Sequence, residues 1–362
     1  MKEPLYQKII RYFKEKIESG ELTKDEKLPS ESEIMELFQT SRITVTRALK
    51  ELELTGSIYR VKGKGSFVSV PRKSNHRIIS LILPHREETY FAGQQYIRSI
   101  YRSCQEKGYL CSVHYSEQSS QRERTILEEV MSHQVSGMIL YPINNRNIDY
   151  ISRMSISGFP IVLLDRNLRE LNLPVVKSDN FQGAWDAVTY LASCGHKKIG
   201  FVGFMDSEAV SLRYQGYCRA LTENRIPLDP SIIISRPEDQ TDEIQAELDQ
   251  NQADRILLEM QQKGVTALFC VNDLIASRMI LAAVKRGITV PGDLSVCGFD
   301  NLKYLQDPDT CLTTVEQDFN RIGETCVNLL TSLIETGRTD QAAGIIPTRL
   351  LEGNTVRKIP ES

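Results

Sequence analysis

Residues 61–68 read Val-Lys-Gly-Lys-Gly-Ser-Phe-Val, a stretch in which glycines and lysines alternate. Glycines let a backbone come close to a phosphate, and lysines supply positive charge, so the stretch could bind a nucleotide. A phosphate-binding loop of a nucleotide enzyme, however, follows a buried strand and begins a helix. Here β-branched and aromatic residues flank the glycines on both sides, which predicts the tip of a β-hairpin instead.

Polar side chains that could bind a small molecule follow short apolar runs later in the chain. Asp165 and Arg166 follow Ile-Val-Leu-Leu, and Asp300 follows Ser-Val-Cys-Gly-Phe. Ligands of open parallel sheets bind at the carboxyl ends of the strands. Acidic, amide and guanidinium groups match sugar hydroxyls, and an aromatic ring packs on the C–H face of a sugar. The candidate set is Tyr90, Phe91, Asp165, Arg166, Arg213, Asn272, Asp300 and Gln317.

Each of these residues taken alone also has a purely structural explanation. An Asp or Asn at a strand end usually caps a helix or forms a turn. We assign that role to Asp273 and Asn301, which lie beside the candidates. Only the set as a whole favours a ligand cleft.

The sequence contains no residue spacing that is typical of catalysis or of a cofactor site. The five histidines, at 76, 85, 114, 133 and 196, have no metal-binding spacing, and the eight cysteines form no Cys-x-x-Cys pair. There is no nucleophile elbow and no Walker loop. We therefore expect no enzyme activity, no cofactor and no metal, and cysteines that are buried in a reducing compartment.

The net charge of −3 is distributed unevenly over the 362 residues. Residues 42–73 hold eight basic and two acidic side chains, a local net charge of +6. Such a patch on an otherwise acidic chain indicates an anionic partner for one small domain. No apolar stretch has the length of a signal peptide or a membrane span, so we expect a cytoplasmic protein without a membrane partner.

The first 70 residues have the periodicity of three helices followed by a hairpin. Residues 4–19 carry a helical apolar stripe that ends at Gly20. Ser30 and Glu33 have the spacing of a capping box, and Ser41 can cap a third helix. The pattern predicts an α+β winged helix-turn-helix domain in residues 1–70. Its third helix would present Arg42, Thr44, Thr46 and Arg47 to the DNA major groove, and Lys62 and Lys64 would reach a neighbouring phosphate or the minor groove.

Short apolar runs alternate with helical periodicity from residue 78 onwards. Nearly continuous apolar strands that alternate with helices predict a parallel sheet buried on both faces. This region is too long for one ordinary sheet, so we expect an α/β domain of two lobes with a cleft between them. We place a linker at residues 71–77 and the two-lobed domain, which would also carry the dimer contact, at residues 78–356.

The first 70 residues resemble the GntR family of winged helix-turn-helix domains. The shared features are Leu-Pro-Ser-Glu-x-Glu, Ser-Arg-x-Thr-Val, and Gly-x-Gly-Ser-Phe-Val. The resemblance implies that the third helix and the hairpin tip contact operator DNA. The candidate DNA-binding residues are Ser30, Ser41, Arg42, Thr44, Thr46, Arg47, Lys62, Gly63, Lys64 and Gly65. The family often has Arg where Ser32 stands and where Thr46 stands, so operator sequence does not carry over.

Residues 78–352 resemble the effector domain of LacI-type regulators, which is itself similar to type I periplasmic sugar-binding proteins. The stretches Leu-Arg-Tyr-Gln-Gly-Tyr and Val-Cys-Gly-Phe-Asp-Asn carry the resemblance, among others. It implies that Asp165, Arg213, Asn272 and Asp300 contact the effector and that Gln317 lies on the third strand that crosses between the lobes. The pattern is especially similar to ribose-binding proteins, which favours a monosaccharide such as a pentose over a purine. Arg236 and Pro237 stand where the family often has an aromatic wall.

A GntR-type reader joined to a LacI-type sensor resembles the arabinose-repressor arrangement. It implies a sugar-responsive transcriptional regulator, a repressor that binds double-stranded operator DNA as a homodimer and changes its affinity when a monosaccharide binds. An alternative from another class is a carbohydrate-active enzyme with a DNA-binding appendage. The absence of a catalytic constellation in the sequence argues against that alternative.

Overall fold

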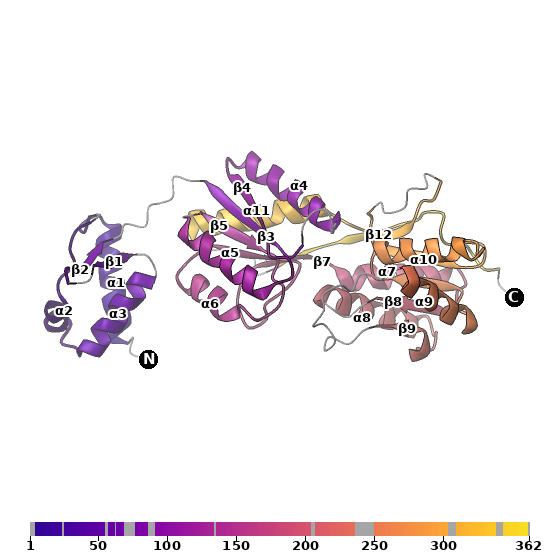
Figure 1. The fold of residues 1–362 in the computed structure, drawn as a ribbon, viewed down its shortest axis with the longest axis horizontal. Helices are drawn as coiled ribbons and strands as arrows, with labels where there is room; N and C mark the ends of the chain where they lie inside the picture. The colour runs from indigo at the N-terminus through magenta and orange to yellow at the C-terminus, as the bar shows by residue number, and fades with distance from the viewer. Residues whose placement is uncertain are drawn as a thin grey trace. The chain divides into compact units, whose positions relative to one another are not determined.

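A computed structural model describes residues 4–23, 25–54, 57–61, 63–68, 77–85, 91–133, 135–203, 207–235, 250–302, 309–337 and 343–360 of the chain. The chain divides into two compact units (Figure 1). One unit contains the N-terminal elements together with Asp149–Phe159, which includes most of α6 (Ile148–Ile156). The other unit contains the remaining elements.

The N-terminal elements form the predicted winged helix-turn-helix. They are α1 (Leu5–Glu18), α2 (Glu31–Phe38), α3 (Arg42–Leu54), β1 (Ile58–Val61) and β2 (Gly65–Val68). The two strands are antiparallel, with Ile58 opposite Val68 and Val61 opposite Gly65. One apolar side of each helix is buried in a small common core. The largest buried side chains there are Ile9, Phe13, Leu28, Ile34, Leu49 and Leu52.

The first lobe of the larger unit is built on a six-stranded parallel sheet with the order β13-β7-β6-β5-β3-β4. Its strands are β3 (Ile78–Leu83), β4 (Leu110–Tyr115), β5 (Gly137–Leu140), β6 (Ile161–Leu164), β7 (Val175–Ser178) and β13 (Ala343–Ile346). The helices α4 (Phe91–Glu106), α5 (Ser120–Ser132) and α11 (Phe319–Thr336) belong to this lobe. The short apolar strands β3, β5 and β6 are buried, as the sequence predicts for a sheet that is covered on both faces.

The second lobe has a six-stranded sheet with the order β14-β12-β11-β10-β8-β9. Its strands are β8 (Ile199–Val202), β9 (Ile233–Ile234), β10 (Ala267–Cys270), β11 (Ser295–Asp300), β12 (Thr313–Gln317) and β14 (Thr348–Leu351). The helices are α7 (Asn180–Ser193), α8 (Glu208–Glu223), the short 3-10 turn Pro230–Ile232, α9 (Gln250–Gln262) and α10 (Asp273–Lys285). The sheet is parallel except for β14, which runs antiparallel to β12.

The chain passes between the two lobes three times, between β7 and α7, between β12 and α11, and between β13 and β14. Gln317 therefore ends the strand before the second crossing, and its expected place on the third is wrong. The crossing segments are hydrogen-bonded to one another. The Asp179 N–H donates to the Ile346 carbonyl oxygen at 2.8 Å, and the Ser178 hydroxyl donates to Gln317 Oε1 at 2.5 Å.

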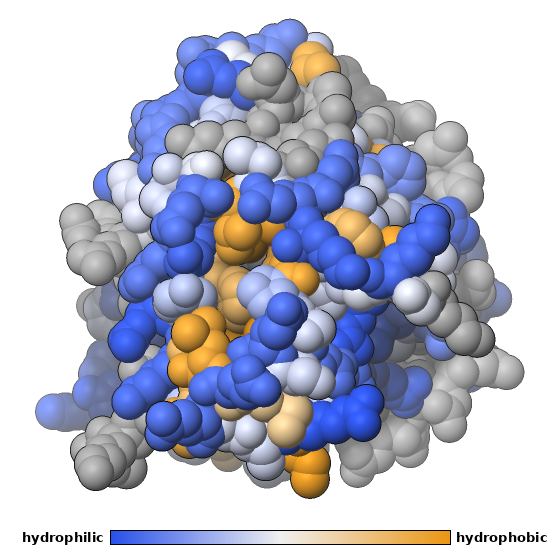
Figure 2. Space-filling view, turned by 90° about the vertical axis from the view of Figure 1, so that its left-hand side faces the viewer, coloured by the Kyte–Doolittle hydropathy of each residue, from blue (hydrophilic) through white to orange (hydrophobic). Residues whose placement is uncertain are grey.

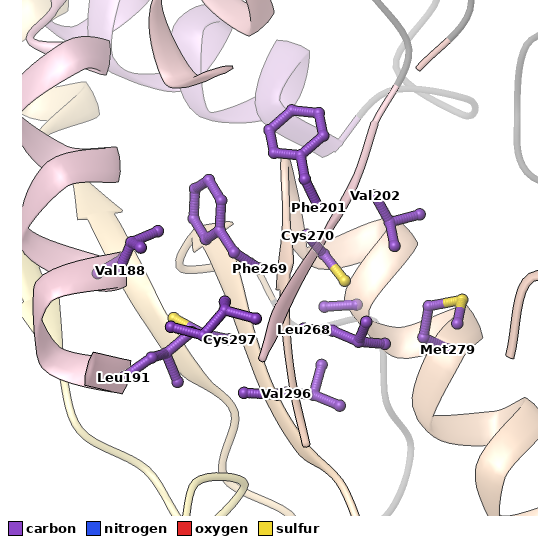
Figure 3. Packing of buried hydrophobic residues seen from close by; sticks show 14 of the residues in the cluster. Val188, Leu191, Phe201, Val202, Leu268, Phe269, Cys270, Met279, Val296 and Cys297 are labelled. Carbon is purple, nitrogen blue, oxygen red and sulfur yellow. The ribbon is translucent and has the colours of Figure 1, made fainter. Parts of the chain in front are cut away.

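The core of the second lobe is packed between the sheet and its helices. Figure 3 shows Phe201, Phe269 and Cys270 from neighbouring strands together with side chains from α7 and α10. The cysteines largely follow the expectation of buried apolar residues, since Cys104, Cys194, Cys270, Cys297 and Cys326 are buried. Cys311 is exposed and departs from it.

Candidate functional site

Two serines begin the helices that form the helix-turn-helix. Ser30 and Glu33 make the predicted capping box, since the Glu33 N–H donates to Ser30 Oγ at 3.3 Å and the Ser30 N–H donates to Glu33 Oε2 at 2.7 Å. The Ser41 carbonyl oxygen accepts from the Thr44 and Val45 N–H groups at 3.1 and 3.2 Å. The hydroxyls of Ser41 and Thr44 lie 3.0 Å apart. Both serines thus have structural roles at helix starts.

The side chain of Arg42 at the first position of α3 is largely exposed. Its Nε lies 3.2 Å from Glu31 Oε2, and the other oxygen of Glu31 accepts from Arg60 at 2.9 Å. Glu31 therefore holds one arginine from α3 and one from β1. Such an exposed pair is weak, and Arg42 remains available to an anionic or base-edge partner.

Arg47 is engaged within its own domain. Its guanidinium carbon lies 3.9 Å from the centre of the Tyr6 ring of α1. The expected role of Arg47 as a base-contacting residue therefore competes with a cation–π contact. Thr46 is half-buried on the same helix.

The hairpin tip has the geometry that its glycines predict. Gly63 and Gly65 have φ of +75° and +116°, a region that side-chain-bearing residues rarely adopt. The Lys64 N–H donates to the Val61 carbonyl oxygen at 3.0 Å and closes the turn, and the Lys64 side chain is exposed. Lys62 lies outside the described residues. Figure 2 faces the left-hand side of Figure 1, where these elements are drawn, and shows mostly hydrophilic side chains with apolar ones between them.

Arg213 of α8 is the centre of a buried polar cluster in the larger unit. Its Nε donates to Asn180 Oδ1 at 2.8 Å, its Nη1 donates to the Val271 carbonyl oxygen, and its Nη2 lies 3.2 Å from Asp300 Oδ1. The guanidinium carbon is 3.6 Å from the centre of the Phe299 ring. A guanidinium held on several sides in this way is a rigid donor for an oxygen-rich ligand.

Asp300, at the end of β11, and Gln317, at the end of β12, are joined directly. Gln317 Nε2 donates to Asp300 Oδ1 at 2.6 Å. Burial raises the pKa of Asp300 to about 6, although the Arg213 charge and the Gln317 hydrogen bond both lower it. Asp300 has a φ of 111°, so its backbone is in the region that favours glycine. Such strain often accompanies functional positions.

Asp165, at the end of β6 in the first lobe, belongs to the same electrostatic environment. The Tyr141 hydroxyl donates to Asp165 Oδ2 at 2.7 Å. Burial raises the pKa of Asp165, while the Tyr141 hydrogen bond and the charges of Arg213 and Lys177 lower it. Arg213, Asp300 and Gln317 are thus in direct contact, and Asp165 of the first lobe is near enough for its charge and those of Arg213 and Asp300 to affect one another.

Other predicted effector residues have different partners. Asn272 caps α10, since its Oδ1 accepts from the Ile275 N–H at 2.9 Å, and Arg166 donates to the Ile143 carbonyl oxygen. The helix cap expected at Asp273 therefore belongs to Asn272. Asp273 instead accepts from the Leu302 N–H and from the Thr314 hydroxyl, each at 2.6 Å.

Asn301 also departs from the capping role expected of it, because its Nδ2 donates to Glu316 Oε1 at 3.0 Å. Tyr90, Arg236 and Pro237 lie outside the described residues. Phe91 begins α4, but its side chain lies outside them too.

Sequence reasoning missed three members of the polar cluster, namely Tyr141, Ser178 and Asn180. Each of them ends or follows a strand of the first lobe, β5 for Tyr141 and β7 for the other two. The strand-end rule that found Asp165 could also have found them.

Glu208, in the first turn of α8, connects the two lobes. Its carboxylate accepts from the Asn167 N–H at 3.2 Å and lies 3.2 Å from Lys177 Nζ and 3.4 Å from Arg169 Nη2. The first two contacts are sheltered, because the side chains of Lys177 and Glu208 are 15% and 17% exposed. Three groups of the first lobe thus meet one carboxylate of the second.

Two family models match separate parts of the chain. Residues 5–68 match the bacterial regulatory proteins of the gntR family, and residues 188–356 match the periplasmic binding protein-like domain. The chain is a transcriptional regulator that joins a GntR-type DNA-binding domain to a periplasmic-binding-protein-like domain.

Two relatives named as transcriptional repressors match most of the regulator's length. The arabinose metabolism transcriptional repressor of Geobacillus stearothermophilus is 29% identical over 98% of both chains. The transcriptional repressor CytR of Escherichia coli K12 is 29% identical over 90% of the regulator and 92% of CytR. These relatives are named as repressors, so the regulator groups with DNA-binding proteins and not with carbohydrate-active enzymes.

Solved structures share the fold of the larger unit. A LacI family regulator from Enterococcus faecium with bound ribose has a TM-score of 0.65 at 22% identity and covers 78% of this chain and 100% of its own. A LacI-type regulator from Alkaliphilus metalliredigens complexed with D-xylulofuranose has a TM-score of 0.62 at 23% identity, over 77% and 99%. The two-lobed periplasmic-binding-protein-like fold is therefore confirmed.

The described part of the regulator contains neither of two other kinds of feature, a metal site or a membrane span. Within it, no group of three or more His, Cys, Asp or Glu side chains could hold a metal ion. No helix among the same residues has the length and apolar character that a membrane crossing requires.

Proposed function

We propose that this regulator is a repressor whose operator affinity is controlled by a monosaccharide of the pentose class. Residues 1–70 read the operator, residues 71–77 link the domains, and residues 78–356 bind the effector and a second copy of the chain. The observation that carries the sensor half is the buried cluster of Arg213, Asp300, Gln317 and Asp165, which draws on both lobes.

The chemistry of this cluster supports a polyhydroxylated ligand. The guanidinium supplies donors, the carboxylates supply acceptors, and the Gln317 amide supplies one of each. A sugar hydroxyl both donates and accepts, so it can replace the hydrogen bonds that these groups now make with one another. A ligand held by both lobes stabilises their closed arrangement, and its binding is then reciprocally coupled to operator affinity.

The pentose class is supported by what similar proteins are named for. A relative is named for arabinose metabolism, and two structural neighbours hold ribose and D-xylulofuranose. The assignment to five-carbon sugars rests on these names, since the cluster itself is suited to sugar hydroxyls in general.

We infer a homodimer because one recognition helix contacts only a short half-site, which gives too little sequence specificity by itself. Leu281 and Val284 of α10 are exposed apolar side chains, and such residues are suited to an interface between two copies. Operator binding places the protein in the cytoplasm. Sedimentation at micromolar concentration tests the dimer, and a monomer with full operator affinity would contradict it.

The sensor is tested by operator release. A labelled operator is bound by the purified protein and titrated with L-arabinose, D-ribose, D-xylose, D-glucose and adenosine. We expect one pentose to change operator affinity at least about tenfold, a coupling within the usual range of allosteric free energies. If no sugar changes operator affinity or the melting temperature, the sensor proposal is wrong.

The DNA-binding domain is tested by two substitutions, each of which removes one positive charge. Arg42→Ala should weaken operator binding by about 1–3 kcal/mol and relax the base preference, because an Arg side chain can donate two hydrogen bonds to O6 and N7 of a guanine. Lys64→Ala should weaken binding evenly across sequences and reduce the salt slope by about 1. If the unaltered protein binds operator and random DNA equally, sequence-specific reading is refuted.

A further inference from the structure

Ile43, the second residue of α3, is an apolar side chain in an unexpected position. It is 81% exposed, while Val45 and Leu49 of the same helix are 0% and 1% exposed. A single exposed apolar residue is common on protein surfaces and requires no explanation by itself. The direction in which Ile43 points and the residues around it, however, indicate that it contacts a binding partner.

The core-facing residues of α3 are Val45, Ala48, Leu49 and Leu52. Successive residues of a helix are rotated by about 100°, so Ile43 points almost directly away from the centre of this group. Its neighbours on the same face, one and two turns further on, are Arg47 and Lys50, which are both exposed. Viewed along the helix axis, Ile43 thus lies at the centre of the outward-facing side of α3, in its first turn.

The residues around Ile43 indicate what covers it. Arg42 and Thr44 flank it in the chain, and the side chain of Arg42 is 78% exposed. An apolar protein partner would meet cations and hydroxyls on every side of one isoleucine. DNA matches the cations, because its phosphates are anionic, and it also offers one apolar group in the major groove, the 5-methyl group of thymine.

We propose that Ile43 packs against a thymine methyl group in each half-site and thereby specifies a T·A base pair. The inference rests on the proposed operator binding and adds a specificity residue to it. Ile43 supplies no hydrogen bond, so it acts by excluding water from the methyl group and by leaving no partner for the amino group of cytosine.

The test separates the methyl group from the rest of the base. Operators are first selected from random duplex DNA with the unaltered protein. Each thymine of a half-site is then replaced by deoxyuridine, which lacks only the methyl group. We expect one position at which this replacement weakens binding about 3–10-fold, the loss of roughly one buried methyl group or a little more.

The variant Ile43→Ala should bind the thymine operator about 3–10-fold more weakly and should lose no further affinity at the deoxyuridine operator. Ile43→Val should keep most of the discrimination. Leu37→Ala serves as the matched control, because Leu37 is an exposed apolar residue of α2. It should leave the thymine preference unchanged. Circular dichroism melting should be the same for all variants, since both side chains are exposed.

Two results would count against the inference in distinguishable ways. If the protein binds the selected operator and deoxyuridine costs the same in Ile43→Ala as in the unaltered protein, the thymine contact is refuted and operator binding stands. If no sequence is enriched from random DNA, operator binding itself is refuted and the inference falls with it.

Discussion

Lys177 and Glu208 belong to different lobes of the effector domain, and their charged groups lie 3.2 Å apart. The same carboxylate accepts the Asn167 N–H from the first lobe at 3.2 Å. These contacts join the two lobes directly. We take the arrangement that they stabilise as the closed one, in which they add to the contacts that a sugar would make.

The first prediction concerns this contact. Glu208→Gln keeps the shape of the side chain but removes its charge, so the closed arrangement should lose about 1 kcal/mol. Affinity for the operator-releasing sugar should fall about 3–10-fold in calorimetric titration. Glu259→Gln is the control, because Glu259 of α9 pairs with Lys263, which directly follows the same helix and belongs to the same lobe. Equal sugar affinity in the Glu208 variant and the unaltered protein would contradict the prediction.

The second prediction concerns Arg213 and the pH dependence of stability. The folded-state pKa of Asp300 is about 6, above its ordinary value of 3.8. Its contribution to stability is therefore full below pH 3.8 and is lost as the pH rises towards 6. Arg213→Met removes a charge that lowers this pKa, so the loss extends to higher pH.

Urea unfolding measures this effect at two pH values. At pH 7.5, Arg213→Met should cost about 3–5 kcal/mol, because it leaves a buried carboxylate without its cation. At pH 5 the carboxyl group is protonated and the cost should be clearly smaller. The double variant Arg213→Met/Asp300→Asn should reduce the difference between the two pH values, and the part that remains belongs to other carboxyl groups such as Asp165, whose pKa the Arg213 charge also lowers. A single-variant cost that does not depend on pH would exclude Asp300 as its cause.

The third prediction separates two arginines of the recognition helix. Arg47 stacks on Tyr6 within the domain, whereas Arg42 is exposed. Arg47→Ala should therefore lower the stability of the N-terminal domain by about 0.5–1 kcal/mol and weaken operator binding less than Arg42→Ala does. Thermal unfolding and gel-shift titration measure the two effects. A larger binding loss for Arg47→Ala would show that Arg47 leaves Tyr6 in the complex.

The fourth prediction concerns the packing of α7 on α8. A Cβ atom at Gly216 would lie 2.3 Å from the Phe181 carbonyl oxygen and 3.0 Å from Ala184 Cβ. Alanine usually stabilises a helix interior by about 1 kcal/mol relative to glycine. Here we expect Gly216→Ala to destabilise by about 1–3 kcal/mol, because the helices would have to separate.

The neighbouring variant Gln215→Ala serves as the control for Gly216→Ala, because Gln215 is exposed on the same helix. Its unfolding free energy should change by less than about 0.5 kcal/mol. A stable Gly216→Ala protein would mean that α7 and α8 are not held as closely as described.

Features that depend on neighbours in the sequence were predictable. The capping box of Ser30 and Glu33 follows from their spacing, and the positions of Asp165 and Asp300 follow from the apolar strands before them. The hairpin tip at Gly63 and Gly65 follows from the need for a positive φ between two short strands.

Features that depend on tertiary contacts were not predictable. Asn272 could bind a ligand or cap a helix, and only its contact with the Ile275 N–H decides between them. Ser178 and Gln317 are 139 residues apart and meet only because β7 and β12 end together. The sequence alone does not single out Ile43, because polar groups are the usual candidates for base contacts in DNA. The extent of its exposure is known only once the structure shows which face of α3 is buried.

The three passages between the lobes affect how the protein is made on the ribosome. The first lobe begins at β3 but lacks α11 and β13 until residues 319–346 have been synthesised. By then the strands of the second lobe from β8 to β12 have already emerged. The winged helix can fold early in synthesis. The first lobe is completed only when residues 319–346 emerge, and the sheet of the second lobe only when residues 348–351 do. A chain that stops at residue 318 would therefore carry a DNA-binding domain without a complete effector domain.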